Sequence, residues 1–193
     1  FGDFTAIKDV NMTIKPGEIH GLVGESGAGK STVGAAVIGL LQAPGYVSSG
    51  TLTLGDTDLR RLTFAQAHEI RGNRISMIFQ DPQTSLNPLM TIEDQLVETI
   101  QAHSDASKTA ARKRAVNLLE DIGIKNASQR IKAYPHQFSG GMCQRVVIAL
   151  AICTDPEMII ADEPTTALDV AVQSQVLDLI QQLAKERQIA FIL

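Results

Sequence analysis

Residues 24–31 carry the clearest chemistry of the chain, because they read Gly-Glu-Ser-Gly-Ala-Gly-Lys-Ser. This octet fits G-x-x-x-x-G-K-[ST], the pattern of the phosphate-binding loop (P-loop) of nucleoside-triphosphate enzymes. The glycines let successive backbone N–H groups turn inward and bind phosphate oxygens. Lys30 is expected to reach the β- and γ-phosphates, and the Ser31 hydroxyl is expected to bind Mg²⁺.

The segments on either side of the loop are suited to position it. Residues 20–23 read as a short buried strand, although His20 and Gly21 are weak strand formers. Residues 32–41 read as a helix, whose N-terminus would point its partial positive charge at the phosphates. Strand, loop and helix in this order favour a phosphate site over a plain glycine-rich turn.

A pair of acids follows a second apolar run, with Asp162 and Glu163 directly after Met-Ile-Ile-Ala at residues 158–161. A carboxylate at the end of a buried strand suits the far side of a Mg²⁺–nucleotide site, where Asp162 would hold the metal ion through water. Glu163 would then polarise a water molecule aimed at the γ-phosphate. Apolar runs that end in acids are common, so the prediction depends on the P-loop earlier in the chain.

A second candidate anion site is formed by Ser139, Gly140 and Gly141, which precede an apolar helix predicted over residues 141–153. The simpler alternative is an ordinary serine N-cap. One chain has no use for two phosphate-binding helix N-termini unless the second serves a nucleotide held elsewhere.

The remaining elements alternate between strands and helices. Turn signals and β-forming residues predict short antiparallel strands within residues 4–14 and 51–54. Apolar runs predict core strands at residues 75–79, 157–161 and 189–193, and periodic apolar faces predict helices at residues 92–103, 107–122 and 170–186. This order indicates an α/β core with a largely parallel sheet and a helical insertion over residues 81–153.

The composition narrows the function classes. The 193 residues suffice for one domain with a core, and a net charge of −4 gives no general affinity for nucleic acid. The longest apolar run, residues 146–153, is far too short to cross a membrane. Cys143 and Cys153 form no disulfide or zinc pattern and suit a reducing compartment.

Taken together, these motifs resemble the ATP-hydrolysing subunits of ABC transporters over essentially the whole chain. The matching segments are Walker A at residues 24–31, the Q-loop at 79–82, the signature at 139–142, Walker B with the catalytic glutamate at 159–163, and the D-loop at 164–169. The signature departs from the usual L-S-G-G-Q, since Phe138 replaces leucine and Met142 replaces glutamine.

The resemblance implies a P-loop NTPase (RecA-like) α/β core with an antiparallel β subdomain and an inserted α-helical subdomain. Residues 1–193 would form a single ABC ATPase domain, truncated at both ends. Residues 1–80 and 154–193 would form the nucleotide-binding core with its N-terminal β subdomain, and residues 81–153 the helical subdomain that carries the signature.

The resemblance also implies the site residues. The ATP-binding residues would be Phe1, which would stack on adenine, and Gly24, Glu25, Ser26, Gly27, Ala28, Gly29, Lys30, Ser31 and Thr32. Ser139, Gly140 and Gly141 would contact the γ-phosphate of ATP bound by a second ATPase domain, and Asp169 would link the two sites. The catalytic residues would be Glu163, Lys30 and Gln80, and the Mg²⁺ ligands Ser31, Gln80 and Asp162.

The implied partners are a second ABC ATPase domain, bound head to tail, and transmembrane permease subunits, with an extracytoplasmic substrate-binding protein acting indirectly. The implied location is peripheral, on the cytoplasmic face of the plasma (inner) membrane. A groove beside residues 80–90 would receive a permease helix on Leu86, Pro88, Leu89 and Met90, unless these residues simply pack under the helical insertion.

Residues 80–88, 134–142 and 161–170 resemble the dipeptide, oligopeptide and nickel importers, so peptides are the favoured cargo and nickel or another small solute the alternative. Cys143 stands where that group usually has arginine. The competing classes are a soluble, non-transport ABC ATPase, an ATPase fused to an exporter, and a regulatory module without turnover. No zinc module supports the first, and intact Lys30, Asp162 and Glu163 argue against the last.

Both chain ends suggest further sequence. The chain begins with Phe1 rather than methionine and stops inside the apolar run 189–193, before the point where the family carries its switch histidine. His20, His68, His103 and His136 are poor substitutes for that residue. As a fragment, the chain is therefore expected to bind ATP weakly and hydrolyse it poorly.

Overall fold

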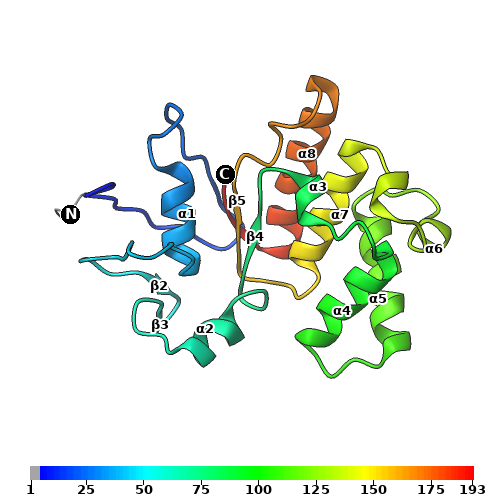
Figure 1. Cartoon of the computed structure of the whole chain (residues 1–193), viewed down its shortest axis with the longest axis horizontal. Helices are drawn as coiled ribbons and strands as arrows, with labels where there is room; N and C mark the ends of the chain where they lie inside the picture. The colour runs from blue at the N-terminus through cyan, green and yellow to red at the C-terminus, as the bar shows by residue number, and fades with distance from the viewer. Residues whose placement is uncertain (1–4) are drawn as a thin grey trace.

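The computed structural model describes residues 5–193 and is built on a parallel four-stranded sheet. The strand order is β1-β6-β5-β4, with every neighbouring pair parallel (Figure 1). The strands are β1 (Ile19–His20), β6 (Ala190–Ile192), β5 (Met158–Ala161) and β4 (Ile75–Ile78). The expected α/β class with a parallel core sheet is confirmed.

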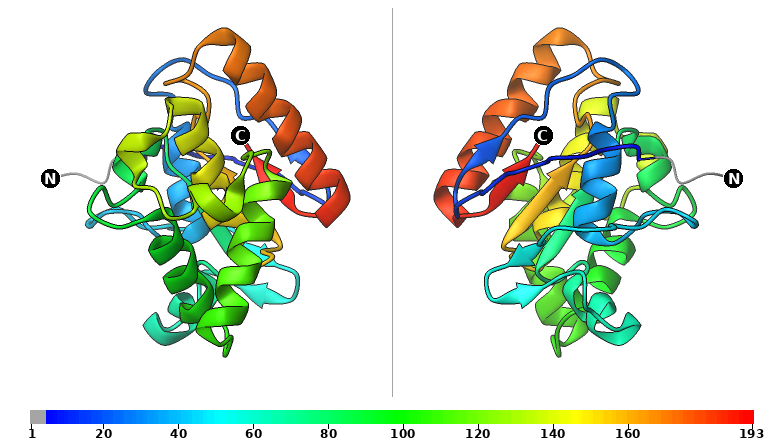
Figure 2. Two further views of the ribbon diagram at one scale, coloured as in Figure 1. Left: turned by 90° about the vertical axis from the view of Figure 1, so that its right-hand side faces the viewer. Right: turned by 90° about the vertical axis from the view of Figure 1, so that its left-hand side faces the viewer.

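Helices cover both faces of this sheet. Helix α1 (Lys30–Ile38) lies on one face, and α7 (Gly140–Ile152) and α8 (Val170–Arg187) lie on the other, as the two views in Figure 2 show. Side chains alternate along β5 accordingly: Ile159 packs in the larger core with the helices α7 and α8, and Ile160 packs in the smaller core with α1. The sheet is therefore buried on both faces, which parallel sheets require.

The chain between β4 and β5 is helical. It contains α3 (Pro82–Ser85), α4 (Ile92–Ala102), α5 (Lys108–Asp121), α6 (Ala127–Arg130), the 3₁₀ turn η1 (Pro135–Gln137) and α7. Thr91 and Ser107 cap α4 and α5 by accepting backbone N–H bonds from Asp94 and Ala110. The predicted apolar face of α4 is buried in the larger core. The division into a separate helical subdomain over residues 81–153 stays a prediction.

The N-terminal region differs from the expected antiparallel strands. An antiparallel hairpin is present, formed by β2 (Thr53–Leu54) and β3 (Thr57–Asp58) and followed by α2 (Phe64–Ile70). The expected strand within residues 4–14 is wrong for the described part, because residues 5–14 belong to no strand. Asp9 has φ 57°, a left-handed value that an extended strand does not adopt.

The two cysteines are buried, at one end and just past the other end of α7. Burial raises the pKa of the Cys143 thiol and raises that of Cys153 to about 12. Both thiols therefore stay protonated near neutral pH and lack the thiolate that nucleophilic chemistry requires. Within residues 5–193, the helices are too short or too polar for any of them to cross a bilayer.

The contact between α1 and the sheet leaves no space for a side chain at Gly34, because a Cβ atom there would lie 2.9 Å from Cγ2 of Ile160. Gly34→Val is expected to lower the free energy of unfolding by about 1–3 kcal/mol through overpacking. Urea unfolding monitored by circular dichroism measures the change.

Ala36→Val is the matched control, because Ala36 is only half-buried on the same helix. Helix propensity alone favours valine at position 34 over valine at position 36, since glycine is the poorer helix former and alanine the best. A larger loss at position 34 must then come from packing, and an equal loss in the two variants would contradict the predicted contact.

Candidate active site

The P-loop lies between β1 and α1, at the edge of the sheet where the parallel strands end. Helix α1 begins at Lys30, and Gly29 precedes it as N-cap with φ 92°. Gly27 is also left-handed, with φ 83°, and the Ala28 N–H donates to the Glu25 carbonyl at 3.1 Å. Glycine adopts these φ values without steric cost, and such turns form the concave backbone surfaces that bind anions.

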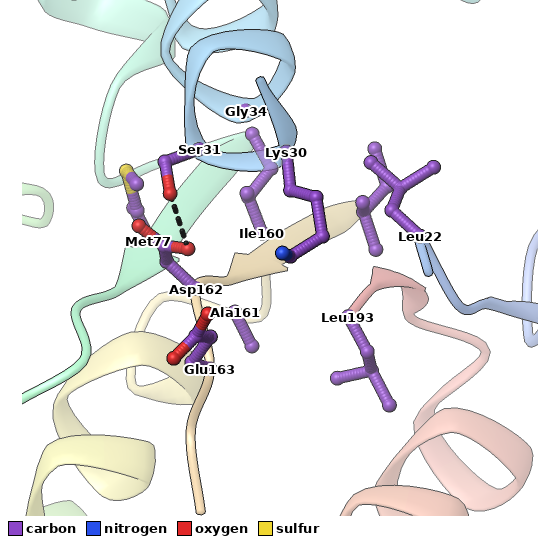
Figure 3. Close-up of a pocket in the computed structure, with 11 residues that line it drawn as sticks. Leu22, Lys30, Ser31, Gly34, Met77, Ile160, Ala161, Asp162, Glu163 and Leu193 are labelled. Atoms are coloured by element: carbon purple, nitrogen blue, oxygen red, sulfur yellow. Dashed lines mark hydrogen bonds between the residues drawn. The ribbon is translucent and has the colours of Figure 1, made fainter. Parts of the chain in front are cut away.

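Lys30 folds back across this loop. Its Nζ donates to the carbonyl oxygens of Gly24 at 2.9 Å and Glu25 at 3.1 Å. Figure 3 shows the ammonium group directed into the pocket between α1 and the strand ends. The positive charge therefore lies beside the loop whose N–H groups would bind phosphate.

Ser31 and Asp162 meet across the sheet edge. The Ser31 hydroxyl donates to Oδ1 of Asp162 at 2.8 Å (Figure 3). Asp162 directly follows β5, and its backbone N–H donates to the Ile78 carbonyl at 2.9 Å, which extends the β4–β5 ladder by one step. The structure thus brings together a hydroxyl from α1 and a carboxylate from β5.

These two oxygens fit Mg²⁺. The ion prefers oxygen ligands and usually takes only one or two from protein, leaving the rest to phosphates and water. Within residues 5–193, no group of three or more His, Cys, Asp or Glu side chains could hold a metal ion by itself. A Mg²⁺ site at Ser31 and Asp162 would therefore need phosphate oxygens to complete it.

Glu163 lies beside this pair in an unusual backbone conformation. Its φ is 48°, a left-handed value that costs a non-glycine residue about 1–3 kcal/mol and is concentrated at functional sites. Its Oε2 accepts two hydrogen bonds, from Gln80 Nε2 at 2.8 Å and from Thr166 Oγ1 at 3.1 Å. Gln80 follows β4, the neighbour of β5, so the parallel register brings the two side chains together.

The pocket at this edge combines polar and apolar walls. Its lining residues are Leu22, Lys30, Ser31, Gly34, Met77, Ile160, Ala161, Asp162, Glu163, Ile192 and Leu193. Sequence reasoning missed the apolar members, although all but Gly34 lie in or next to strands that end here. Sequence reasoning also left out Thr166, and the available signal was its position three residues after Glu163.

Ser139, Gly140 and Gly141 are placed elsewhere. The Ser139 Oγ caps α7 by accepting from the Met142 N–H at 3.4 Å. A Cβ on Gly141 would lie 2.5 Å from Cγ1 of Val172, so the close approach of α8 requires glycine there. None of the three lines the pocket with Lys30, and α7 lies across the sheet from α1 (Figure 1).

The other predicted residues have simpler surroundings. Asp169 caps α8, since its Oδ1 accepts from the Val172 N–H at 3.0 Å. Glu25, Ser26 and Thr32 are exposed on the loop and α1, and Phe1 lies outside the described residues. The four histidines are absent from the lining of this pocket as far as residues 5–193 show.

The residues expected to meet a permease divide into two kinds. Leu86 is only 2% exposed and belongs to the larger core, so ordinary packing explains it. Leu89 is 85% exposed and Pro88 is exposed, whereas Met90 is half-buried. Phe79, which was not among the expected contacts, is 50% exposed. Apolar side chains this exposed are available to another protein.

Comparison with known proteins identifies this arrangement. The chain is 44% identical over 197 residues to the dipeptide transport ATP-binding protein DppD of Escherichia coli (strain K12), covering 100% of this chain and 60% of that protein. It is 47% identical over 186 residues to the oligopeptide transport ATP-binding protein OppD of Bacillus subtilis (strain 168), covering 96% and 52%. The chain therefore spans between half and two thirds of the length of these relatives.

Solved structures give the same result. The dimeric ATP-binding cassette MJ0796, in a post-hydrolysis state bound to ADP and Pi, matches with a TM-score of 0.79 and 30% identity, covering 97% of this chain and 78% of that one. The family model described as ABC transporter matches residues 7–166, which include the P-loop, Gln80, the signature and both acids. The chain belongs to the ABC transporter family and has the fold of its ATP-binding cassettes.

Proposed function

We propose that this chain binds ATP with Mg²⁺, hydrolyses the ATP, and so powers the import of dipeptides or oligopeptides. One observation carries the proposal: a lysine, a hydroxyl and two carboxylates, from Lys30, Ser31, Asp162 and Glu163, line a single pocket at the sheet edge. These are the groups that phosphoryl transfer to water needs.

Each residue has a separate role in this reaction. Lys30 and the loop N–H groups would bind the β- and γ-phosphates, and Ser31 and Asp162 would hold Mg²⁺, which would neutralise phosphate charge. Glu163 accepts a proton from the attacking water, and Gln80, at hydrogen-bond distance from Glu163, helps to orient that water. Phe1 would stack on the adenine.

A second copy or a paralogous domain completes the site. The N-terminus of α7, with Ser139, Gly140 and Gly141, lies away from the P-loop of its own chain. In a head-to-tail pair it would contact the γ-phosphate held by the partner, as helix N-termini bind anions. Support comes from MJ0796, whose structure is described as dimeric and bound to ADP and Pi. Asp169 would lie between the two sites.

The transport role is supported by the relatives, which are named as dipeptide and oligopeptide transport proteins. We propose a peripheral location at the cytoplasmic face of the membrane, on permease subunits that meet the exposed Phe79 and Leu89. A substrate-binding protein would act through the permease. The net charge of −4 favours no nucleic-acid partner.

Glu163→Gln in the full-length protein is expected to lower steady-state ATP turnover by about 10²–10⁴-fold, the usual range for loss of a general base. The amide keeps the shape of the side chain, so ATP binding persists and the ATP-bound dimer accumulates. Phosphate release measures turnover, and size-exclusion chromatography with ATP measures the dimer. Turnover near the wild-type rate would remove Glu163 from its proposed role.

Lys30→Ala and Ser139→Ala are expected to affect different steps. Lys30→Ala removes a charged donor to phosphate and should weaken ATP binding by the monomer by about tenfold or more. Ser139→Ala should leave binding by the monomer within about twofold of wild type but lower turnover by about tenfold, because the hydroxyl acts on the partner's nucleotide.

Binding of a fluorescent ATP analogue to dilute protein separates these two outcomes. Lys15→Ala is the matched control, since Lys15 is an exposed lysine close to the loop in sequence but outside the pocket. Weakened binding in the Ser139→Ala monomer would contradict a site shared between two chains.

A further inference from the structure

Thr166 makes a two-point contact with the proposed catalytic glutamate. Its Oγ1 donates to Oε2 of Glu163 at 3.1 Å, and its backbone N–H donates to the Glu163 carbonyl at 3.2 Å. The second bond closes a turn that starts at the left-handed Glu163 and passes through the buried Pro164. One residue therefore supports both the strained backbone and the carboxylate of Glu163.

Both donors to the Glu163 carboxylate use the same oxygen. Gln80 Nε2 donates to Oε2 at 2.8 Å, and Thr166 Oγ1 donates to the same oxygen at 3.1 Å. Oε1 accepts no bond from any side chain within residues 5–193. Two bonds on one oxygen restrict rotation of the carboxylate about its last torsion, which is otherwise broad. Oε1 is then presented with its lone pairs available.

The two donors differ in what else can move them. Gln80 follows a strand end and, in the proposed reaction, helps to orient the attacking water. Thr166 is tied to Glu163 through a four-residue turn, so it stays close to the carboxylate even if Gln80 turns toward that water.

We propose that Thr166 is a positioning residue for hydrolysis, which holds Oε2 of Glu163 so that Oε1 faces the attacking water. The inference rests on the proposed ATPase function. In the step itself the water oxygen forms a bond to the γ-phosphorus, the bond from that phosphorus to the ADP oxygen breaks, and a water proton passes to Oε1. Thr166 touches none of these reacting atoms.

The test compares three variants of the full-length protein. Thr166→Val removes the hydroxyl donor and keeps the branched shape, and we expect kcat for ATP hydrolysis to fall by about tenfold, the lower range for one hydrogen bond to a charged group. KM should stay within about twofold, because no ATP contact is lost. Thr166→Ser restores the donor and should return kcat to within about threefold of wild type.

Thr109→Val is the matched control. Thr109 is an exposed threonine on α5, outside the segment 164–169 and outside the pocket that contains Lys30. The same substitution there should leave kcat and KM unchanged. If Thr166→Val fails to fold, Thr166→Ala removes the same donor and carries the same expectations.

Two results would overturn the inference: an unchanged kcat in the variant without the donor, or a Thr166→Ser variant as slow as Thr166→Val. A double-mutant cycle adds a second criterion, because Thr166→Val should cost nothing further in the Glu163→Gln background, where the general base is already lost. A full additional loss there would mean that Thr166 acts on another group. Wild-type turnover by Glu163→Gln alone would instead defeat the proposed function.

Discussion

The parallel register of β4, β5 and β6 is the constraint on which the site depends. Ile78 pairs with Ala161, so the residues that follow these two strands leave the sheet side by side. Gln80 and Glu163 then lie within 2.8 Å of each other although 83 residues separate them in sequence. A slip of one residue would turn each side chain of β5 to the other face of the sheet and would shift Asp162 and Glu163 away from Ser31 and Gln80, because side chains alternate along a strand.

The second requirement is that α1 lies very close to β5. Gly34 allows this approach, and the same helix then carries Ser31 to within 2.8 Å of Asp162. The backbone strain of the site is local, because it lies at Glu163, whose left-handed φ few non-glycine residues adopt. The buried strand before Glu163 and the turn to Thr166 hold this conformation. The strained residue is therefore the one proposed as general base.

The sequence predicted the parts of this site whose chemistry is local. The P-loop pattern contains both the glycines that need positive φ and the lysine and serine that follow them. The two acids come directly after an apolar run, so their place at a strand end follows from their sequence position. Long-range contacts were less accessible. The position of Thr166 three residues after Glu163 was the available signal, but that spacing alone does not predict a bond between the two side chains. The left-handed conformation of Asp9 depends on one φ angle that residue type does not determine. The missed helix α2 is short, and its capping box of Thr63 and Gln66 was the available signal.

The distance between the two proposed anion sites, the P-loop and the N-terminus of α7, links hydrolysis to domain movement under the proposed function. Lys30 begins α1 and Ser139 caps α7, and these helices lie on opposite faces of one sheet. The two residues of one chain therefore cannot meet while the sheet stays rigid. A γ-phosphate that touches both must then lie between two chains, so its presence favours the closed pair and its loss releases that preference. A ligand shifts such an equilibrium only by its difference in affinity for the two states. Under the proposed function the γ-phosphate supplies that difference, because Ser139 of the second chain would contact it. Under the proposed function, hydrolysis therefore converts the breaking of one bond into rigid-body separation of two domains.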